Sequence, residues 1–234
     1  MSYPIKYPTP QGANVQIFQG GDPQTTGHLF EKTWVKPQGA SFVWFTLIGG
    51  GGGDDRDAVA FVGGGSGAVT NCMVPAFLIP DSLTVVVGTG SPSNGNGAVS
   101  QIFYQQKTGT GYSLLTANGG AGGGSGGAGG VAMTANYFTA MGFFQSIAGQ
   151  AGGNPTTASA TTFLSGGSYS GATTANYGYS TSRSGFFQMQ PIIVGVGGGS
   201  TSPGKGGVGC GAGGTGGGAT TGIGGDGLVV IVTW

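Results

Sequence analysis

The sequence predicts an all-β protein in which short antiparallel strands frame a layered block of glycine-rich threefold helices of the polyglycine II type. One observation is that 56 of the 234 residues are glycine. A second is that β-branched and aromatic segments directly adjoin the glycine runs. A third is that hardly any segment has apolar residues at helical spacing, so we expect almost no α-helix. The glycine runs are residues 49–53, 63–67, 119–130, 195–199 and 204–227.

Glycine has no Cβ, so glycine segments can lie directly against several neighbouring backbones. The runs lack the strict period of collagen, but they can adopt a left-handed threefold helix. Such a helix has no internal hydrogen bonds, so its N–H and C=O groups need lateral partners or water. We therefore expect parallel and antiparallel glycine segments in layers, with loops leaving at the two ends of the block. The expected core glycines are Gly50, Gly64, Gly123, Gly126, Gly198, Gly207 and Gly217.

The first 39 residues contain several prolines and short alternating segments such as 14–18. Residues that flank proline are held extended, which favours strand and turn over helix. We expect residues 1–39 to form an extended N-terminal attachment or capping segment. Residues 40–234 are expected to form the glycine-rich β/polyglycine domain.

Within that domain, residues 41–48 form a β-branched and aromatic segment that runs straight into glycines. Segments 75–87 and 98–104 follow, with a turn signal about every ten residues, which is typical of an antiparallel sandwich or barrel. The best helical candidate is 131–147, and Gly142 interrupts it. The closing segment 228–234 is strongly apolar, and we expect it to pair with 41–48.

The charge content argues against several classes of partner. Seven basic and seven acidic residues give a formal net charge of zero. Such a surface has no electrostatic footprint for nucleic acid or an anionic membrane and does little to resist association. No apolar run approaches the roughly 20 residues that span a bilayer, and the first residues do not resemble a signal peptide. We expect no nucleic-acid binding, no membrane insertion and no Sec-type export.

Residues with catalytic or metal-binding chemistry are scarce. Segment 199–206 imitates a phosphate-binding loop, but Gly206 replaces the required hydroxyl residue and more glycines follow, which excludes the helix. The acidic segment 54–57 lacks the ligand spacing of a calcium loop. His28 and Glu31 are the sole residues of their types. We expect no catalytic residue, no metal, no cofactor and no enzyme activity.

The two cysteines, Cys72 and Cys210, do not make a disulfide framework in a chain of this length. A pair between them and two free thiols both stay open, and we favour the free thiols.

Aromatic residues gather in the loops of the second half. Tyrosine and arginine suit recognition surfaces, because they provide contact area and a polar group at small entropic cost. The alternative is that these side chains cover the ends of a block whose interior has none; Phe143 and Phe144 fit that role better. The candidate receptor-binding residues are Tyr137, Phe138, Tyr169, Tyr177, Tyr179 and Arg183.

The order of these segments suggests a family. A strand followed by glycines at 49–53 and 63–67, the segment 80–88, repeated glycine blocks and the closing 224–232 resemble the glycine-rich domains of tailed-phage tail fibre and receptor-binding proteins. The chain is also similar in kind to the polyglycine-sandwich adhesins at the tips of T-even-like long tail fibres. The resemblance covers roughly 30–234. It implies a virion structural protein, a distal tail fibre or adhesin, whose loops between glycine runs bind a host surface receptor.

The resemblance also implies partners and a location. It implies contact with other virion proteins through the N-terminal segment, a protein or glycan receptor, assembly in the host cytoplasm and an extracellular position on the particle. A homotrimer and a single chain at a fibre tip both stay open. The chain departs from the family at 156–165 and 172–183, which have little glycine, and before Gly39, where nothing matches the adhesins' fibre-attachment domain.

Two other functions stay open beside the adhesin. One is a non-adhesive head or neck appendage. The other is an ice-binding or matrix polyglycine protein, suggested by Thr-Thr pairs whose spacing is irregular.

Overall fold

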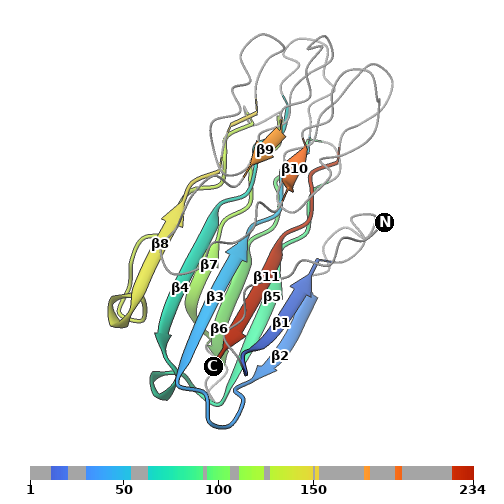
Figure 1. Cartoon of the computed structure of the whole chain (residues 1–234). Coiled ribbons are helices and arrows are strands. Elements are labelled where there is room, and N and C mark those ends of the chain that lie inside the picture. The colour runs from blue at the N-terminus through green and yellow to red at the C-terminus, as the bar shows by residue number, and fades with distance from the viewer. Residues whose placement is uncertain are drawn as a thin grey trace.

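The computed structural model describes residues 12–20, 30–53, 63–91, 94–105, 111–123, 127–149, 151–152, 177–179, 193–196 and 223–234. Two antiparallel sheets pack face to face (Figure 1). The strands are β1 (Asn14–Gln19), β2 (Phe30–Val35), β3 (Phe42–Ile48), β4 (Val69–Pro75), β5 (Ser82–Val87), β6 (Ser100–Gln105), β7 (Gly111–Ala117), β8 (Phe143–Ile147), β9 (Tyr177–Tyr179), β10 (Ile193–Val196) and β11 (Leu228–Thr233).

One sheet has five strands in the order β1-β11-β3-β4-β8, and the other has four in the order β2-β5-β6-β7. Strands β9 and β10 form a separate antiparallel pair. The short 3₁₀ turns η1 (Ala76–Leu78) and η3 (Thr139–Met141) lie between strands, and the described residues contain no α-helix. The all-β prediction is therefore confirmed.

The closing strand pairs where the sequence predicted. In β11, Leu228 lies opposite Ile48 and Thr233 opposite Val43, so this strand lies antiparallel to β3. Its other edge pairs with β1. First and last strands of the glycine-rich region are neighbours in the sheet, as expected.

The core lies between the two sheets and follows the two-residue period of the strands. Val43, Phe45 and Leu47 of β3 are fully buried and belong to the same cluster as alternate residues of β5, β7 and β11. Trp34 of β2 closes this cluster, with its ring edge-on to Phe45 at a centroid distance of 6.2 Å. A smaller cluster of Ile48, Val69, Leu228 and Val230 lies on the other face of the five-stranded sheet.

The expected boundary at residue 39 does not separate two units. β1 is an edge strand of the five-stranded sheet, and β2 is an edge strand of the four-stranded sheet. Trp34, on β2, has 1% of its surface exposed. Burial of that indole and the two strand pairings make β1 and β2 part of the sandwich.

The helical candidate 131–147 is not a helix. It contains the single turn η3, an extended Gly142 (φ −162°, ψ −159°) and strand β8. Tertiary pairing of β8 with β4 outweighs the weak helical spacing of the segment.

Candidate functional site

The described glycine segments all lie at one end of the sandwich. They follow β3, β5, β7 and β8 and precede β4, β6 and β11, and alternate chain directions bring these strand ends together. Figure 1 shows them beyond the strands, at the end opposite the C-terminus. We call them the glycine block: residues 49–53, 63–68, 88–91, 94–99, 118–123, 127–130, 149, 151–152 and 223–227.

Lateral backbone hydrogen bonds hold the block together, and they repeat every three residues. In the segment 49–53, the N–H groups of Gly49 and Gly52 donate to segment 63–68, at 3.0 and 2.9 Å. Those of Gly50 and Gly53 donate to segment 94–99, at 2.9 and 3.0 Å. The N–H of Gly51 donates to Gly225 at 2.8 Å. Successive residues therefore face three different neighbours, as a threefold helix requires.

The neighbours run in both directions. Gly49 and Gly52 bond to Ala68 and Gly65 in descending order, which makes that pair of segments antiparallel. The N–H groups of Gly120 and Gly123 donate to Gly50 and Gly53 in ascending order, at 2.9 and 2.8 Å, which makes that pair parallel. The lateral partners that the sequence predicted are present in both orientations, and the polyglycine II helix geometry itself stays a prediction.

Close approach of the backbones explains why the residues are glycine. An ideal Cβ added to Gly50 would overlap the carbonyl oxygen of Thr89, and one on Gly64 would overlap that of Gly52. Since both obstacles are backbone atoms, a side chain at either position must separate two segments. Gly123 is buried in the block. The other expected core glycines, Gly126, Gly198, Gly207 and Gly217, lie outside the described residues.

Polar side chains fasten the block to itself and to the sandwich. The Asp226 carboxylate accepts a 2.8 Å hydrogen bond from the N–H of Gly90. The Ser100 hydroxyl accepts from the N–H of Gly88 at 2.9 Å and donates to the carbonyl of Ile48 at 2.6 Å. The Asp226 bond joins two segments of the block, and the Ser100 bonds connect the strand ends to the block.

The structure separates two adjacent aromatic candidates. Tyr137 is 95% exposed, whereas Phe138 is 6% exposed with its ring 6.3 Å from that of Phe45. The expectation that Phe138 contacts a receptor is therefore wrong. Reciprocal hydrogen bonds between Asn136 and Thr139, at 2.8 and 3.0 Å, hold the turn that directs Phe138 into the core.

Among the described candidates, strand β9 with Tyr177 and Tyr179 lies at the end of the sandwich opposite Tyr137. Tyr177 and Tyr179 lie on β9, which Figure 1 shows at the level of the outer part of the glycine block; their side chains are outside the described part. Tyr137 precedes β8 at the opposite end of the sandwich, where Phe143 pairs with Met73. Tyr169 and Arg183 lie outside the described residues.

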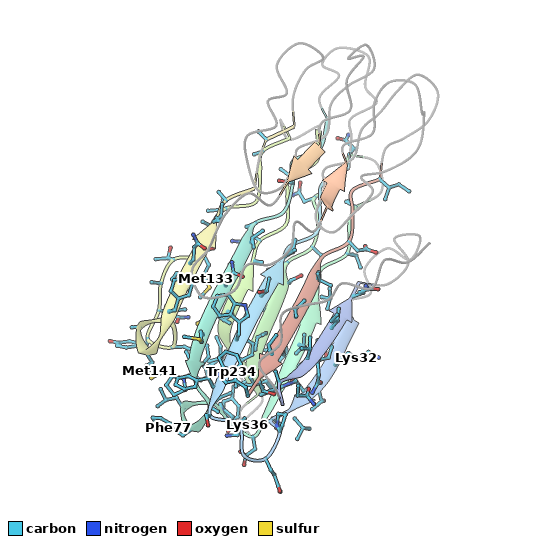
Figure 2. The ribbon with its side chains drawn as sticks, viewed as in Figure 1. Lys32, Lys36, Phe77, Met133, Met141 and Trp234 are labelled. Carbon is cyan, nitrogen blue, oxygen red and sulfur yellow. The ribbon has the colours of Figure 1, made fainter. Side chains whose placement is uncertain are left out.

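That opposite end carries exposed apolar side chains that the sequence did not single out. Phe77 is 82% exposed and Met141 is 44% exposed (Figure 2). Phe77 lies in η1, which the Lys36 ammonium holds by donating to the carbonyls of Ala76 and Ile79 at 3.2 and 2.8 Å. Phe77 belongs to the apolar segment 75–87, and the structure places it in a 3₁₀ turn where its side chain is exposed.

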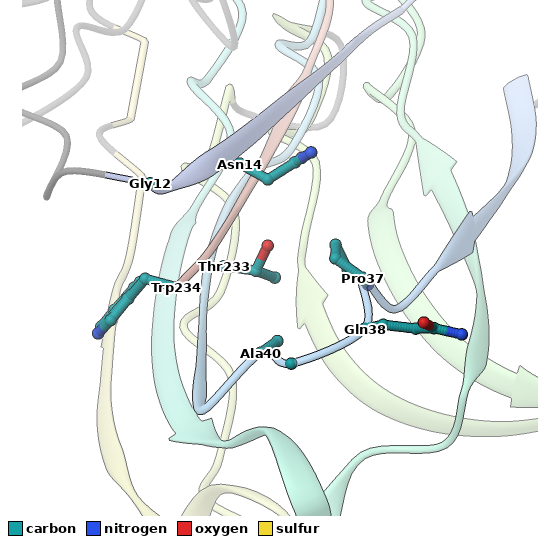
Figure 3. Close-up of a pocket in the computed structure, with 8 residues that line it drawn as sticks. Gly12, Asn14, Pro37, Gln38, Ala40, Thr233 and Trp234 are labelled. Carbon is teal, nitrogen blue, oxygen red and sulfur yellow. The ribbon is translucent and has the colours of Figure 1, made fainter.

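Two hollows occur among the described residues. A pocket of about 100 Å³ lies at the end that carries the C-terminus (Figure 3). An open groove of about 510 Å³ lies along the glycine block. The pocket is lined by Gly12, Asn14, Pro37, Gln38, Gly39, Ala40, Thr233 and Trp234. The groove is lined by Asn96, Gly97, Val99, Asn118, Gly119, Ala121, Ala128, Gly129 and Val131.

The described residues provide few side chains for metal binding or for nucleophilic catalysis. It contains no group of three or more His, Cys, Asp or Glu side chains that could hold a metal ion. Cys72 is a buried free thiol, and burial raises its pKa from 9.0 to about 12, which disfavours the reactive thiolate. The acidic segment 54–57, His28, segment 199–206 and Cys210 lie outside the described residues.

No helix among the described residues is long and apolar enough to cross a membrane.

Fold and hydrogen bonding define an all-β protein built on a laterally bonded glycine block. A family model described as a glycine-rich domain matches residues 24–234. The chain therefore belongs to this glycine-rich domain family. No curated protein matches the sequence.

Proposed function

We propose that the chain is a virion structural protein of a tailed phage, a distal tail-fibre or receptor-binding adhesin that contacts the host surface. The observation that carries the proposal is the three-residue hydrogen-bond period of the glycine block. These hydrogen bonds hold many strand ends together in the close-packed glycine block. The chain segments that connect residues 53 to 63, 123 to 127 and 152 to 223 all start and finish in this block. Binding segments on a rigid scaffold are a common arrangement in recognition proteins.

The two ends of the sandwich support an orientation. Asn14 at the start of β1 pairs with Thr233, so the chain enters the sandwich at the end opposite the glycine block. In our proposal the N-terminal segment contacts other virion proteins at that end, and the glycine end faces the host receptor. The protein would then be assembled in the host cytoplasm and exposed on the particle. The proposal assigns it neither catalysis nor a cofactor.

Adsorption measurements test the proposal. Purified protein should bind susceptible cells and compete with phage adsorption. Tyr177→Ala combined with Tyr179→Ala should weaken that binding without changing the melting temperature. Tyr112→Ala, which removes a tyrosine 58% exposed on β7, is the matched control and should bind normally.

Absence of binding to every host envelope fraction would contradict the adhesin role. Virion incorporation without any cell binding would instead favour the non-adhesive appendage.

A further inference from the structure

The open groove along the glycine block brings together three segments, 94–99, 118–123 and 127–131. Its volume of about 510 Å³ lies within the range typical of small-molecule sites. None of its lining residues is charged. Val131 is 71% exposed at the groove, so an apolar surface adjoins the polar lining.

Two asparagines of the groove each use only half of the side-chain amide. Asn96 Oδ1 accepts a 2.9 Å hydrogen bond from the N–H of Gly122, and its Nδ2 has no partner in the described part of the chain. Asn118 Nδ2 donates to the carbonyl of Val131 at 2.7 Å, and its Oδ1 likewise has none there. The two bonds to backbone fix both amides, so the groove presents one oriented donor and one oriented acceptor.

The backbone of the groove adds further polar groups. Many N–H groups in the block donate to another segment, but among the described residues the N–H and C=O groups of Gly119 and Gly129 have no hydrogen-bond partner. Both residues are partly exposed. Since both residues line the groove, we infer that these groups can bond to a ligand there.

The lining selects among ligand classes. Arginine or lysine commonly recognises phosphate and carboxylate ligands, and the lining has neither. A purely apolar ligand would leave the amide and peptide groups without water or partners. A sugar hydroxyl both donates and accepts, and the C–H face of a sugar ring can pack against valine. We propose that this groove binds a neutral, hydroxyl-rich oligosaccharide; its identity as the host receptor rests on the proposed function.

The test begins with a glycan array that holds neutral and carboxylated oligosaccharides, probed with the full chain. The neutral oligosaccharide that binds best is then titrated into ¹⁵N-labelled protein. We expect the largest amide shifts at Gly119, Gly129 and the side chains of Asn96 and Asn118. Binding of carboxylated glycans alone, or of none, would overturn the proposal.

Asn96→Asp is the most specific variant. It keeps the oxygen that accepts from Gly122 and replaces the free donor by a second oxygen. We expect about a tenfold or greater loss of affinity, the effect of one lost hydrogen bond in a binding site. Asn14→Asp makes the same change on an exposed strand residue at the far end and should bind like the parent. Equal affinity of parent and Asn96→Asp would contradict the assignment.

Val131→Trp gives an independent test, because it fills the groove at an exposed position. Binding should be lost while the melting temperature is unchanged, and retained binding would count against the groove. Cell adsorption separates this proposal from the adhesin function. If the parent and both groove variants adsorb equally, the oligosaccharide bound in the groove is not the host receptor, and the adhesin function stands. If the parent binds oligosaccharide but no cells, the groove proposal stands and the adhesin function fails.

Discussion

Ser100 and Ile48 are joined by a hydrogen bond of 2.6 Å from the serine hydroxyl to the isoleucine carbonyl oxygen. Ser100 begins β6 in one sheet and Ile48 ends β3 in the other, so the bond joins the two sheets where the glycine block starts. The same hydroxyl accepts from the N–H of Gly88. Sandwich and glycine block are therefore connected through a fully buried polar group, and we expect them to unfold together.

Ser100→Ala should destabilise the protein by about 1–3 kcal/mol, because it leaves a buried N–H and a buried C=O without this partner. Urea unfolding measures the effect. Ser113→Ala removes an exposed hydroxyl that accepts from Gln101 and should change stability by less than about 0.5 kcal/mol. Similar losses in both variants would contradict a special role for Ser100.

Gly64→Ala should destabilise by well over about 1 kcal/mol. Glycine-to-alanine changes at compatible positions often stabilise by about 0.4–1 kcal/mol, but here the added methyl group meets the backbone carbonyl of Gly52. Gly111→Ala is the control, since its Cβ would lie 3.2 Å from a carbon of the Phe103 ring, which can shift. Thermal unfolding of both variants gives the comparison, and unchanged melting of Gly64→Ala would exclude close packing of the block.

The free energy of unfolding should depend on pH at alkaline values through the buried Cys72 thiol. Its pKa is raised by burial to about 12 in the folded protein, against 9.0 for an ordinary thiol. Between these values the folded state binds more protons than the unfolded state, so stability falls as the pH rises from about 9 toward about 12. Urea unfolding at several pH values, with thiols kept reduced, should give a shallower alkaline decline for Cys72→Ala. Identical slopes in parent and variant would contradict this assignment.

Thr46→Val should cost about 1–3 kcal/mol. The buried Thr46 hydroxyl accepts from the Trp44 indole at 2.8 Å and donates to Asn71 Oδ1 at 2.9 Å. Valine keeps the shape but removes both bonds. Thr33→Val, on an exposed position of β2, should be nearly neutral in the same unfolding assay. A neutral Thr46→Val would show that the chain of hydrogen bonds adds no stability.

Truncation of Phe138 should lower the free energy of unfolding, whereas truncation of Tyr137 should not. Phe138→Ala empties a buried site beside Phe45 and should cost about 3–5 kcal/mol. Tyr137→Ala removes a side chain that is 95% exposed and should leave the free energy of unfolding unchanged. Equal stabilities of the two variants would contradict the burial of Phe138.

Several features of the fold follow from local pattern. The β-branched and aromatic residues of segment 41–48 predict a strand, and the apolar segment 228–234 is predicted to pair with it, as β3 and β11 confirm. Phe138 could not be distinguished from Tyr137 in this way, because both are aromatic and only the turn held by Asn136 and Thr139 decides which faces the core. Local pattern likewise did not show that β1 and β2 belong to the sandwich, since both pair with strands far away in the sequence.

The glycine content alone determined that some segments pack backbone to backbone, because a residue without a Cβ allows that approach and an unpaired peptide group demands a partner. Which segments meet was decided only by the tertiary structure. One glycine run is chemically like another, so nothing in Gly50 specifies Ala98 as its acceptor. The packing of β3 against β6 in the sandwich sets that choice. The same assembly brings Asn96 and Asn118 to one groove, although they are far from adjacent in sequence.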